Sequence, residues 1–270
     1  MAPEQVAARL VCPVRDCHLA LERKDRRLVC VRAHSFDIAR SGYVNLLQPQ
    51  DRRSRNPGDP AEVVAARRAL HDQGINEPIV RAIAEATSPS SSDVLLEAGC
   101  GDGYYLGSLQ NQSGCSAHGV DISTAAIDAA AKRYKTSEWI VANADRFIPY
   151  ADASFTIVLS IAARMNPPEF QRILKPDGML LVAVPAPDDL IELRGKGRED
   201  RIERTTNEFS KHFEFLAHRR ITTHADLDAA AVANVLLSIY RPMRQEPAPA
   251  MRVTFSLDLL TFRPSTPRPS

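Results

Sequence analysis

From residue 93 to residue 184 the chain alternates short apolar runs with helical segments, and this order restricts the possible fold more than any other feature. The apolar runs are typical of strands, and they are DVLLEA (93–98), AHGVDI (117–122), EWIVA (138–142), SFTIVLSI (154–161) and MLLVAV (179–184). Helical segments such as YLGSLQ, STAAIDAAAKRY and PPEFQRIL separate them. Because strands that alternate with helices form a parallel sheet covered on both faces, the sequence predicts an α/β fold with a doubly wound sheet.

Two helices are predicted before the first of these strands. NPGDPAEVVAARRALHDQG has the signals of a capped helix, with Asp59 as N-cap, Pro60 at the first position, Glu62 at the third and Gly74 as the stop. A second helix is predicted over residues 77–86, and TSPSSS then forms a linker.

Three segments follow the fifth strand. RGKGREDRIERTTNEFSKHF mixes both charges and predicts a solvated helix or a lid, and ADLDAAAVANVLLSIY predicts a further helix. MRVTFSLDLLTF alternates apolar and polar residues, which predicts a strand at a sheet edge.

A glycine cluster, LLEAGCGDGYY, ends the first predicted strand and places Glu97, Gly99, Gly101 and Gly103 in an acid-x-Gly-x-Gly-x-Gly pattern. Glycine lets the backbone turn tightly and approach a ligand at the carboxyl end of a strand. A dinucleotide fingerprint needs a further glycine at 104 or 106, where the chain has tyrosine and leucine, and no P-loop motif is present. The pattern resembles the cofactor motif of S-adenosylmethionine-dependent methyltransferases.

Polar residues after the next two strands fit the same reading. Asp121, at the end of the second strand, is placed to accept hydrogen bonds from a ribose diol. Asn143 and Asp145 follow the third strand, where such enzymes hold the adenine. The alternative is that Asp121 caps the next helix and the glycines only form a tight turn. Cys100 and Cys115 are expected to be small buried apolar residues, not nucleophiles.

Three of the five cysteines lie near the N-terminus. Cys12 and Cys17 form C-x4-C, and Cys30 and His34 form C-x3-H after a β-like stretch. Two such pairs fit a tetrahedral structural zinc site with no open position, and paired cysteines in a reducing compartment are more often metal ligands than disulfides. His18 is an alternative to His34 as the fourth ligand, although the adjacent residues Cys17 and His18 could hardly both bind one tetrahedral zinc ion. Three unrelated cysteines and a surface histidine remain the alternative.

The charge is unevenly distributed. The net charge is +1, but residues 1–60 carry 11 Lys and Arg against 7 Asp and Glu, and the remaining residues carry 23 against 26. Seven basic residues of this segment are Arg23, Lys24, Arg26, Arg27, Arg52, Arg53 and Arg55. A run of charge is usually a solvated face, and a surface for nucleic-acid phosphates is the other interpretation. The start of the chain lacks the pattern of a secretory signal, and no apolar run is long enough for a membrane span, so a soluble cytoplasmic protein is expected.

These motifs together resemble one family. The segments CPVRDC, LVCVRAHSFDIARSGYVNLLQP, RSRNPGDPAEVVAARRALHDQG, LLEAGCGDGYY and GVDISTAAIDAAAKRY are similar to the bacterial 23S rRNA (guanine-N1)-methyltransferases, some of which protect against macrolides such as tylosin. The resemblance implies a Rossmann-like class I methyltransferase sheet with a small N-terminal zinc-binding module. It divides the chain into a zinc-binding module (1–45), a helical connector (46–92) and an S-adenosylmethionine-binding domain (93–270).

The resemblance also assigns functional residues. It implies structural zinc on Cys12, Cys17, Cys30 and His34, although relatives more often have C-x2-C at the first pair, and it places Gly101, Asp102 and Asp121 on cofactor motifs. The full set of residues expected to bind the cofactor is Glu97, Gly99, Gly101, Asp102, Gly103, Asp121, Asn143, Asp145 and Asp189.

Some positions depart from the family pattern and bear on the substrate. Asn76 replaces the tyrosine of Gly-His-Tyr, Arg164 falls in an altered stretch after the fourth strand, and Asp189 stands where relatives often have histidine. The target guanine is expected at the carboxyl ends of the fourth and fifth strands, near Asn166, Asp188 and Asp189, with no catalytic base assigned. The partner is expected to be 23S rRNA, with a homodimer left open. The alternatives are a small-molecule methyltransferase or a non-catalytic RNA-binding protein with a degraded cofactor pocket.

Overall fold

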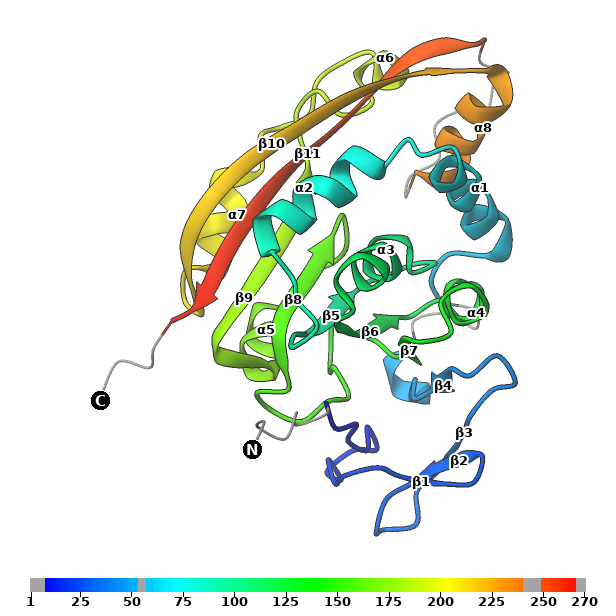
Figure 1. Cartoon of the computed structure of the whole chain (residues 1–270), viewed down its shortest axis with the longest axis vertical. Coiled ribbons are helices and arrows are strands. Elements are labelled where there is room, and N and C mark those ends of the chain that lie inside the picture. Colours follow the sequence, from blue (N-terminus) through cyan, green and yellow to red (C-terminus); the bar gives the residue numbers. More distant parts are fainter. Residues whose placement is uncertain (1–7, 53–56, 240–248, 266–270) are drawn as a thin grey trace.

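One twisted eight-stranded sheet organises the molecule (Figure 1). The computed structural model describes residues 8–52, 57–239 and 249–265. The spatial order of the strands is β10-β11-β9-β8-β5-β6-β7-β4. Their bounds are β4 (Val44–Asn45), β5 (Val94–Ala98), β6 (Ser116–Asp121), β7 (Glu138–Val141), β8 (Phe155–Ile161), β9 (Leu174–Pro185), β10 (Phe213–Leu227) and β11 (Met251–Pro264).

The central strands confirm the predicted alternation. All five predicted strands are present as β5 to β9, and they pair in parallel. Every residue of β5 is buried, as expected for a strand covered on both faces. Since β5 leads to β6 on one side and pairs with β8 on the other, the order of the strands reverses at β5, where open α/β sheets bind ligands.

Helices cover both faces of this sheet, which confirms the doubly wound arrangement. One apolar cluster joins α2, α3 and α4 to one face through Ile83, Leu106 and Ile127, and a second joins α5 and α7 to the other through Phe170 and Phe209. The helices are α1 (Ala61–Asp72), α2 (Glu77–Thr87), α3 (Tyr104–Ser113), α4 (Thr124–Arg133), α5 (Pro167–Ile173), α6 (Ile191–Arg194), α7 (Ile202–Phe209) and α8 (Ala229–Ser238). None of the helices in the described ranges is long and apolar enough to cross a membrane.

The predicted edge position of the last strand is wrong. β11 lies inside the sheet between β9 and β10, and β10, which the sequence analysis did not predict, forms the edge. The polar residues that suggested an edge are buried and are bonded to β10 instead. The Ser256 hydroxyl lies 2.8 Å from that of Thr222, and Asp258 accepts two hydrogen bonds from Arg220. In Figure 1 the two strands form a long curved antiparallel pair along one side of the molecule, with α8 between them in the chain.

The predicted N-cap of α1 is also wrong. Pro60 occupies the cap position without a side-chain cap, and the Asp59 carboxylate accepts a hydrogen bond of 2.7 Å from Nη2 of Arg67. The Asp59 carbonyl in turn accepts from the hydroxyl of Ser123, at the start of α4. The start of α1 is therefore fixed by contacts with distant segments. Gly74 follows the helix with a φ of +76°, as a stop residue should.

The N-terminal module is a three-stranded antiparallel sheet, β1 (Glu22–Lys24), β2 (Arg27–Val29) and β3 (Ser35–Asp37). It lies beside the β4 end of the large sheet (Figure 1), and a hydrogen bond from the Val11 N–H to the Pro149 carbonyl connects the two. The next strand, β4, already pairs in parallel with β7. The chain thus enters the large sheet within its first 45 residues.

Candidate cofactor site and metal centre

The three glycines between β5 and α3 differ in their surroundings. All have positive φ, but a Cβ on Gly99 would lie 2.5 Å from Cβ of Ala163, and one on Gly103 would lie 2.3 Å from the Trp139 ring. A Cβ on Gly101 would meet, among the described residues, only Nη1 of Arg67, at 3.5 Å. Gly99 and Gly103 are therefore required for packing, and Gly101 is the point at which a ligand can approach the backbone.

Asp121 supports this loop from the end of β6. Its Oδ2 accepts a hydrogen bond of 2.9 Å from the Gly101 N–H, and its Oδ1 accepts one of 2.8 Å from the Ser123 N–H. Burial raises the pKa of Asp121. Ser123, not Asp121, caps α4, because its hydroxyl accepts from the Ala126 N–H. A carboxylate has about four acceptor positions, so these two bonds leave capacity for a ligand diol.

Glu97 acts beneath the loop. Its side chain is 1% exposed, and its Oε2 accepts a hydrogen bond of 3.1 Å from the Leu106 N–H in the first turn of α3. Burial raises the pKa of Glu97, and the carboxylates of Asp102 and Asp121 raise it further. Glu97 thus fixes the direction in which α3 leaves the loop.

Asp102 and His71 form a buried pair beside the glycine loop. Asp102 Oδ1 lies 3.4 Å from Nδ1 of His71, whose ring stacks on Tyr104 with centroids 4.1 Å apart. Burial alone would raise the pKa of Asp102, but His71 and Arg67 hold it below its ordinary value. Within the described part of the chain Asp102 Oδ2 is buried without a hydrogen-bond partner. A ligand that donates a hydrogen bond would satisfy it.

The sequence analysis missed the contribution of α1 to this site. His71 and Arg67 both come from α1, and both lie against the glycine loop although they are about 30 residues away in sequence. His71 is buried together with the apolar residues Val64, Ala66 and Leu70 of the same helix. A histidine among the apolar residues of this helix is the sequence signal that could have revealed the contribution of α1.

The other predicted cofactor residues lie further from Gly101. Asn143 donates to the Asp51 carbonyl and accepts from the Asp145 N–H, at the end of β7. Asp145 is exposed and lies 3.5 Å from Nε of Arg164. Asp189 is bonded to the Ser256 N–H of β11, and β8 and β9 lie between that strand and β5. The structure therefore brings Gly101, Asp102 and Asp121 together and places Asp189 beyond β9.

A cavity of about 520 Å³ lies beyond the carboxyl end of β8. Its lining residues come from the end of β7, the segment after β8, and α7, and they are Asp145, Ala163, Arg164, Met165, Arg201, Arg204, Thr205 and Glu208. Ala163 is also the residue that contacts Gly99, so the cavity adjoins the glycine loop. Asn166, expected near the target base, donates to the Ala144 carbonyl instead of capping α5 through its side chain.

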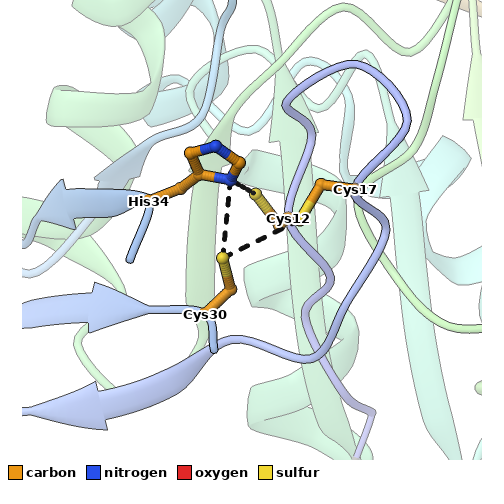
Figure 2. A group of neighbouring side chains, drawn as sticks. All are labelled: Cys12, Cys17, Cys30 and His34. Atoms are coloured by element: carbon orange, nitrogen blue, oxygen red, sulfur yellow. Dashed lines mark hydrogen bonds between the residues drawn. The ribbon is translucent and has the colours of Figure 1, made fainter. Parts of the chain in front are cut away.

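Four side chains converge in the N-terminal module (Figure 2). The ligand atoms of Cys12, Cys17, Cys30 and His34 all lie within 4.8 Å of one another. The Sγ atoms of Cys17 and Cys30 are 3.8 Å apart, and Nδ1 of His34 is 3.3 Å from Cys12 Sγ and 3.5 Å from Cys30 Sγ. Tetrahedral zinc with Zn–S near 2.3 Å and Zn–N near 2.0 Å requires edges of about 3.8 Å and 3.6 Å. The observed spacings match this geometry.

The structure also shows where the other two cysteines and the basic residues of the N-terminal segment lie. Cys100 and Cys115 are buried outside the cluster, as expected, and burial raises the pKa of both thiols. On the β1–β2 hairpin and after β4 the exposed basic residues are Arg23, Lys24, Arg26, Arg27 and Arg52. Arg53 and Arg55 lie outside the described residues.

The fold and this loop define an S-adenosylmethionine-dependent methyltransferase of class I. A family model described as a methyltransferase domain matches residues 96–182, and one described as "RlmA, N-terminal", a zinc ribbon, matches residues 10–55. The 23S rRNA (guanine(748)-N(1))-methyltransferase of Streptomyces fradiae is 32% identical over 254 residues, which are 90% of this chain and 89% of that protein. The chain belongs to the family of 23S rRNA (guanine-N1)-methyltransferases.

Other comparisons agree. A Bacillus subtilis protein whose name gives the same reaction is 38% identical over 193 residues, 68% of this chain and 66% of its own. In the solved structure of a Haloferax volcanii complex between the Trm112 methyltransferase activator and a methyltransferase, the matching chain has a TM-score of 0.53 and 18% identity, with 77% of this chain and 100% of that chain covered. The similarity to this solved structure supports the fold alone.

Proposed function

We propose that this protein transfers the methyl group of S-adenosylmethionine to N1 of a guanine in a hairpin loop of 23S rRNA. The observation that carries the proposal is that one chain combines the tetrahedral Cys3His cluster with a glycine loop open at Gly101, and is 32% identical along 90% of its length to an enzyme named for that reaction. We assign residues 1–45 to RNA contact, 46–92 to the connector and 93–270 to cofactor binding and transfer. A cytoplasmic location and a homodimer stay predictions.

The residues around Gly101 fit the cofactor chemically. Asp121 has acceptor capacity for the ribose diol, and the unsatisfied Oδ2 of Asp102 suits the methionyl ammonium group. Arg67 presents Nη1 toward Gly101 and suits the methionyl carboxylate. Asn143 and Asp145, at the end of β7, are assigned to the adenine. Glu97, Gly99 and Gly103 act by positioning the loop. Asp189 is bonded to the Ser256 N–H and is not among the residues that line the cavity, so its contact with the cofactor stays a prediction.

The cavity beside Ala163 suits an extruded base. Bound S-adenosylmethionine supplies a methyl group on an electrophilic sulfonium. N1 of the guanine would give its proton to solvent and attack that methyl in line, while the sulfur–methyl bond breaks and S-adenosylhomocysteine leaves. The main task of the protein is therefore alignment of the two reacting groups. Asp145 and Glu208 are the carboxylates that line the cavity. Ala163 lines the cavity and also contacts Gly99 of the glycine loop. A base in the cavity would therefore approach the loop from the side of β8.

The zinc cluster has a structural role in this proposal. Three thiolates and one imidazole complete a tetrahedron, so no position is left for a substrate. The cluster orders the β1–β2 hairpin, which carries Arg23, Lys24, Arg26 and Arg27 at the surface. RNA phosphates are the partners expected for this hairpin.

Primer extension on 23S rRNA tests the proposal. Methylation of N1 blocks Watson–Crick pairing, so reverse transcription should stop one nucleotide before the modified guanine when rRNA is incubated with this protein and S-adenosylmethionine. Omission of the cofactor is the matched control. The contrary result is a protein that binds S-adenosylmethionine and yet gives no reverse-transcription stop and transfers no methyl label, either to free rRNA or to ribosomal subunits. That result would overturn the rRNA assignment and favour a small-molecule substrate.

A further inference from the structure

The chain from the end of α6 into α7 carries arginines at positions 194, 198, 201 and 204. Arg201 and Arg204 line the cavity beyond β8, together with Arg164. Arg198 lies three residues before Arg201, and its backbone N–H donates a hydrogen bond of 2.7 Å to the Pro187 carbonyl, just beyond β9. Burial and the charges of Arg194 and Arg201 lower the pKa of Arg198. Arg201 and Arg204 lie at the cavity and Arg194 and Arg198 precede them along the chain, and these four residues are called the arginine cluster below.

Several guanidinium donors of this cluster are unsatisfied. Nε and Nη2 of Arg194 and Nε of Arg198 are buried, and within the described ranges none of them has a hydrogen-bond partner. Buried N–H groups without acceptors, and like charges held close together, both cost free energy of folding. Such an arrangement persists in functional sites where a ligand supplies the missing acceptors and the opposite charge.

Nearby carboxylates neutralise the cluster only in part. Oδ2 of Asp189 lies 3.9 Å from Nη2 of Arg198, beyond hydrogen-bond distance. Its Oδ1 is already bonded to the Ser256 N–H. Burial raises the pKa of Asp189, which shows that the surroundings disfavour its charged form. Asp145 and Glu208 also line the cavity, but they face three arginines there, Arg164, Arg201 and Arg204, so a phosphate can still add negative charge.

The position of the cluster indicates which anion it binds. Arg201 and Arg204 share the cavity with Ala163, which contacts Gly99 of the cofactor loop. A base in that cavity carries its own phosphodiesters at the cavity mouth, and guanidinium groups bind phosphate oxygens with two parallel hydrogen bonds. An extruded nucleotide also needs its backbone held while the base is out of the stack.

We propose that Arg194, Arg198, Arg201 and Arg204 bind the RNA phosphodiester next to the methylated guanine and hold its backbone while the base occupies the cavity. This inference rests on the proposed function, since it takes RNA as the substrate. It assigns these arginines to substrate positioning, whereas the basic β1–β2 hairpin contacts RNA at a distance from the reacting base.

A comparison between basic residues of the same segment tests the proposal. The variant Arg198→Gln/Arg201→Gln removes two charges from the cluster, and Lys196→Gln removes one from an exposed residue of the same segment. Affinity for the target hairpin is measured by fluorescence anisotropy over a series of salt concentrations. We expect the double variant to bind about 10- to 100-fold more weakly, with a salt slope smaller by about 1 to 2, because each lost phosphate contact lowers the slope by roughly 0.7 to 0.9. Lys196→Gln should bind like the wild type.

A modified RNA locates the contact. A methylphosphonate beside the target guanine removes one phosphate charge. It should weaken binding by the wild type and have little further effect on the double variant, since the two changes remove the same contact. An equal effect of the methylphosphonate on both proteins would overturn the assignment, as would wild-type affinity in the double variant.

Three further readouts on the double variant separate the possible failures. The double variant should keep its zinc and its affinity for S-adenosylmethionine, and its urea midpoint should be unchanged or higher, because the substitutions remove unsatisfied charges. A lower midpoint would show that the arginines stabilise the fold, which contradicts the proposal. If the wild type itself neither binds nor methylates the hairpin, the proposed function fails, and this inference fails with it.

Discussion

The backbone N–H of Gly101 donates a hydrogen bond of 2.9 Å to Oδ2 of Asp121. One carboxylate at the end of β6 thus holds the loop after β5 at the glycine where a ligand can approach. The loop and the acid, which the sequence presents as two motifs, form one structural unit in the folded protein.

Replacement of Asp121 should therefore weaken cofactor binding strongly. Asp121→Ala removes both the support of the loop and the acceptor assigned to the ribose, and hydrogen bonds to charged groups contribute about 1.5–3 kcal/mol. At 1.4 kcal/mol per factor of ten, calorimetry should show a Kd for S-adenosylmethionine raised by about 10- to 100-fold. Asp177→Ala, in an exposed turn of β9, is the control. Binding by Asp121→Ala equal to that of the control would refute this role.

The Cys3His cluster should lose its metal when one ligand is replaced. Cys30→Ser leaves three ligands, so a colorimetric zinc assay should find less than one equivalent, and amides of residues 8–45 should exchange faster with deuterium. Cys115→Ser replaces a buried cysteine outside the cluster and should keep its zinc. Stoichiometric zinc in purified Cys30→Ser is the result that would exclude this residue as a ligand.

The contact of Gly99 with Ala163 should limit substitution at either residue. Gly99→Ala places a Cβ 2.5 Å from that of Ala163 and forces a φ of +77° on an alanine. Overpacking and positive φ each cost about 1–3 kcal/mol of the free energy of unfolding, measured in urea. In the double variant Gly99→Ala/Ala163→Gly the steric cost should be recovered, while the cost of the positive φ should remain. If the changes in free energy of unfolding of the two single variants simply add in the double variant, this contact does not limit packing.

Asp258 should make stability depend on pH. Its side chain is fully buried, it accepts two hydrogen bonds from Arg220, and Nε2 of His218 lies 2.7 Å from Oδ1. Burial alone would raise the pKa of Asp258, but Arg220 and His218 hold it below its ordinary value. A carboxyl group with a depressed pKa in the folded state contributes stability above its unfolded pKa of about 3.9, and that contribution is lost as the pH falls toward the folded value.

Urea unfolding of Asp258→Asn provides the measurement. At pH 7 the free energy of unfolding should fall by about 1–3 kcal/mol, because a neutral amide loses the charge-assisted hydrogen bonds that the buried carboxylate accepts from Arg220. The difference from the wild type should shrink as the pH is lowered to about 3, where the wild-type carboxyl group also takes up a proton. Asp226→Asn, on the exposed side of β10, should have little effect. A difference that is the same at both pH values would contradict this linkage.

The sequence alone determined the central strands, the glycine loop and the four metal ligands. These features depend on local spacing: an apolar run of five or six residues between turns predicts a buried strand, and C-x4-C and C-x3-H each close a short turn that brings two ligands together. The helix at residues 77–86 was likewise predictable from its own periodicity, and it is present as α2.

Only the tertiary structure decided which parts of the chain complete the site. It brought Arg67 and His71 of α1 to the glycine loop, left Gly101 open while Gly99 and Gly103 are packed, and inserted β11 between β9 and β10. Polar residues on β11 looked like those of an edge strand, and they are buried because β10 supplies their partners. Such contacts join segments tens of residues apart, so local periodicity does not encode them and the packing of the whole sheet fixes them.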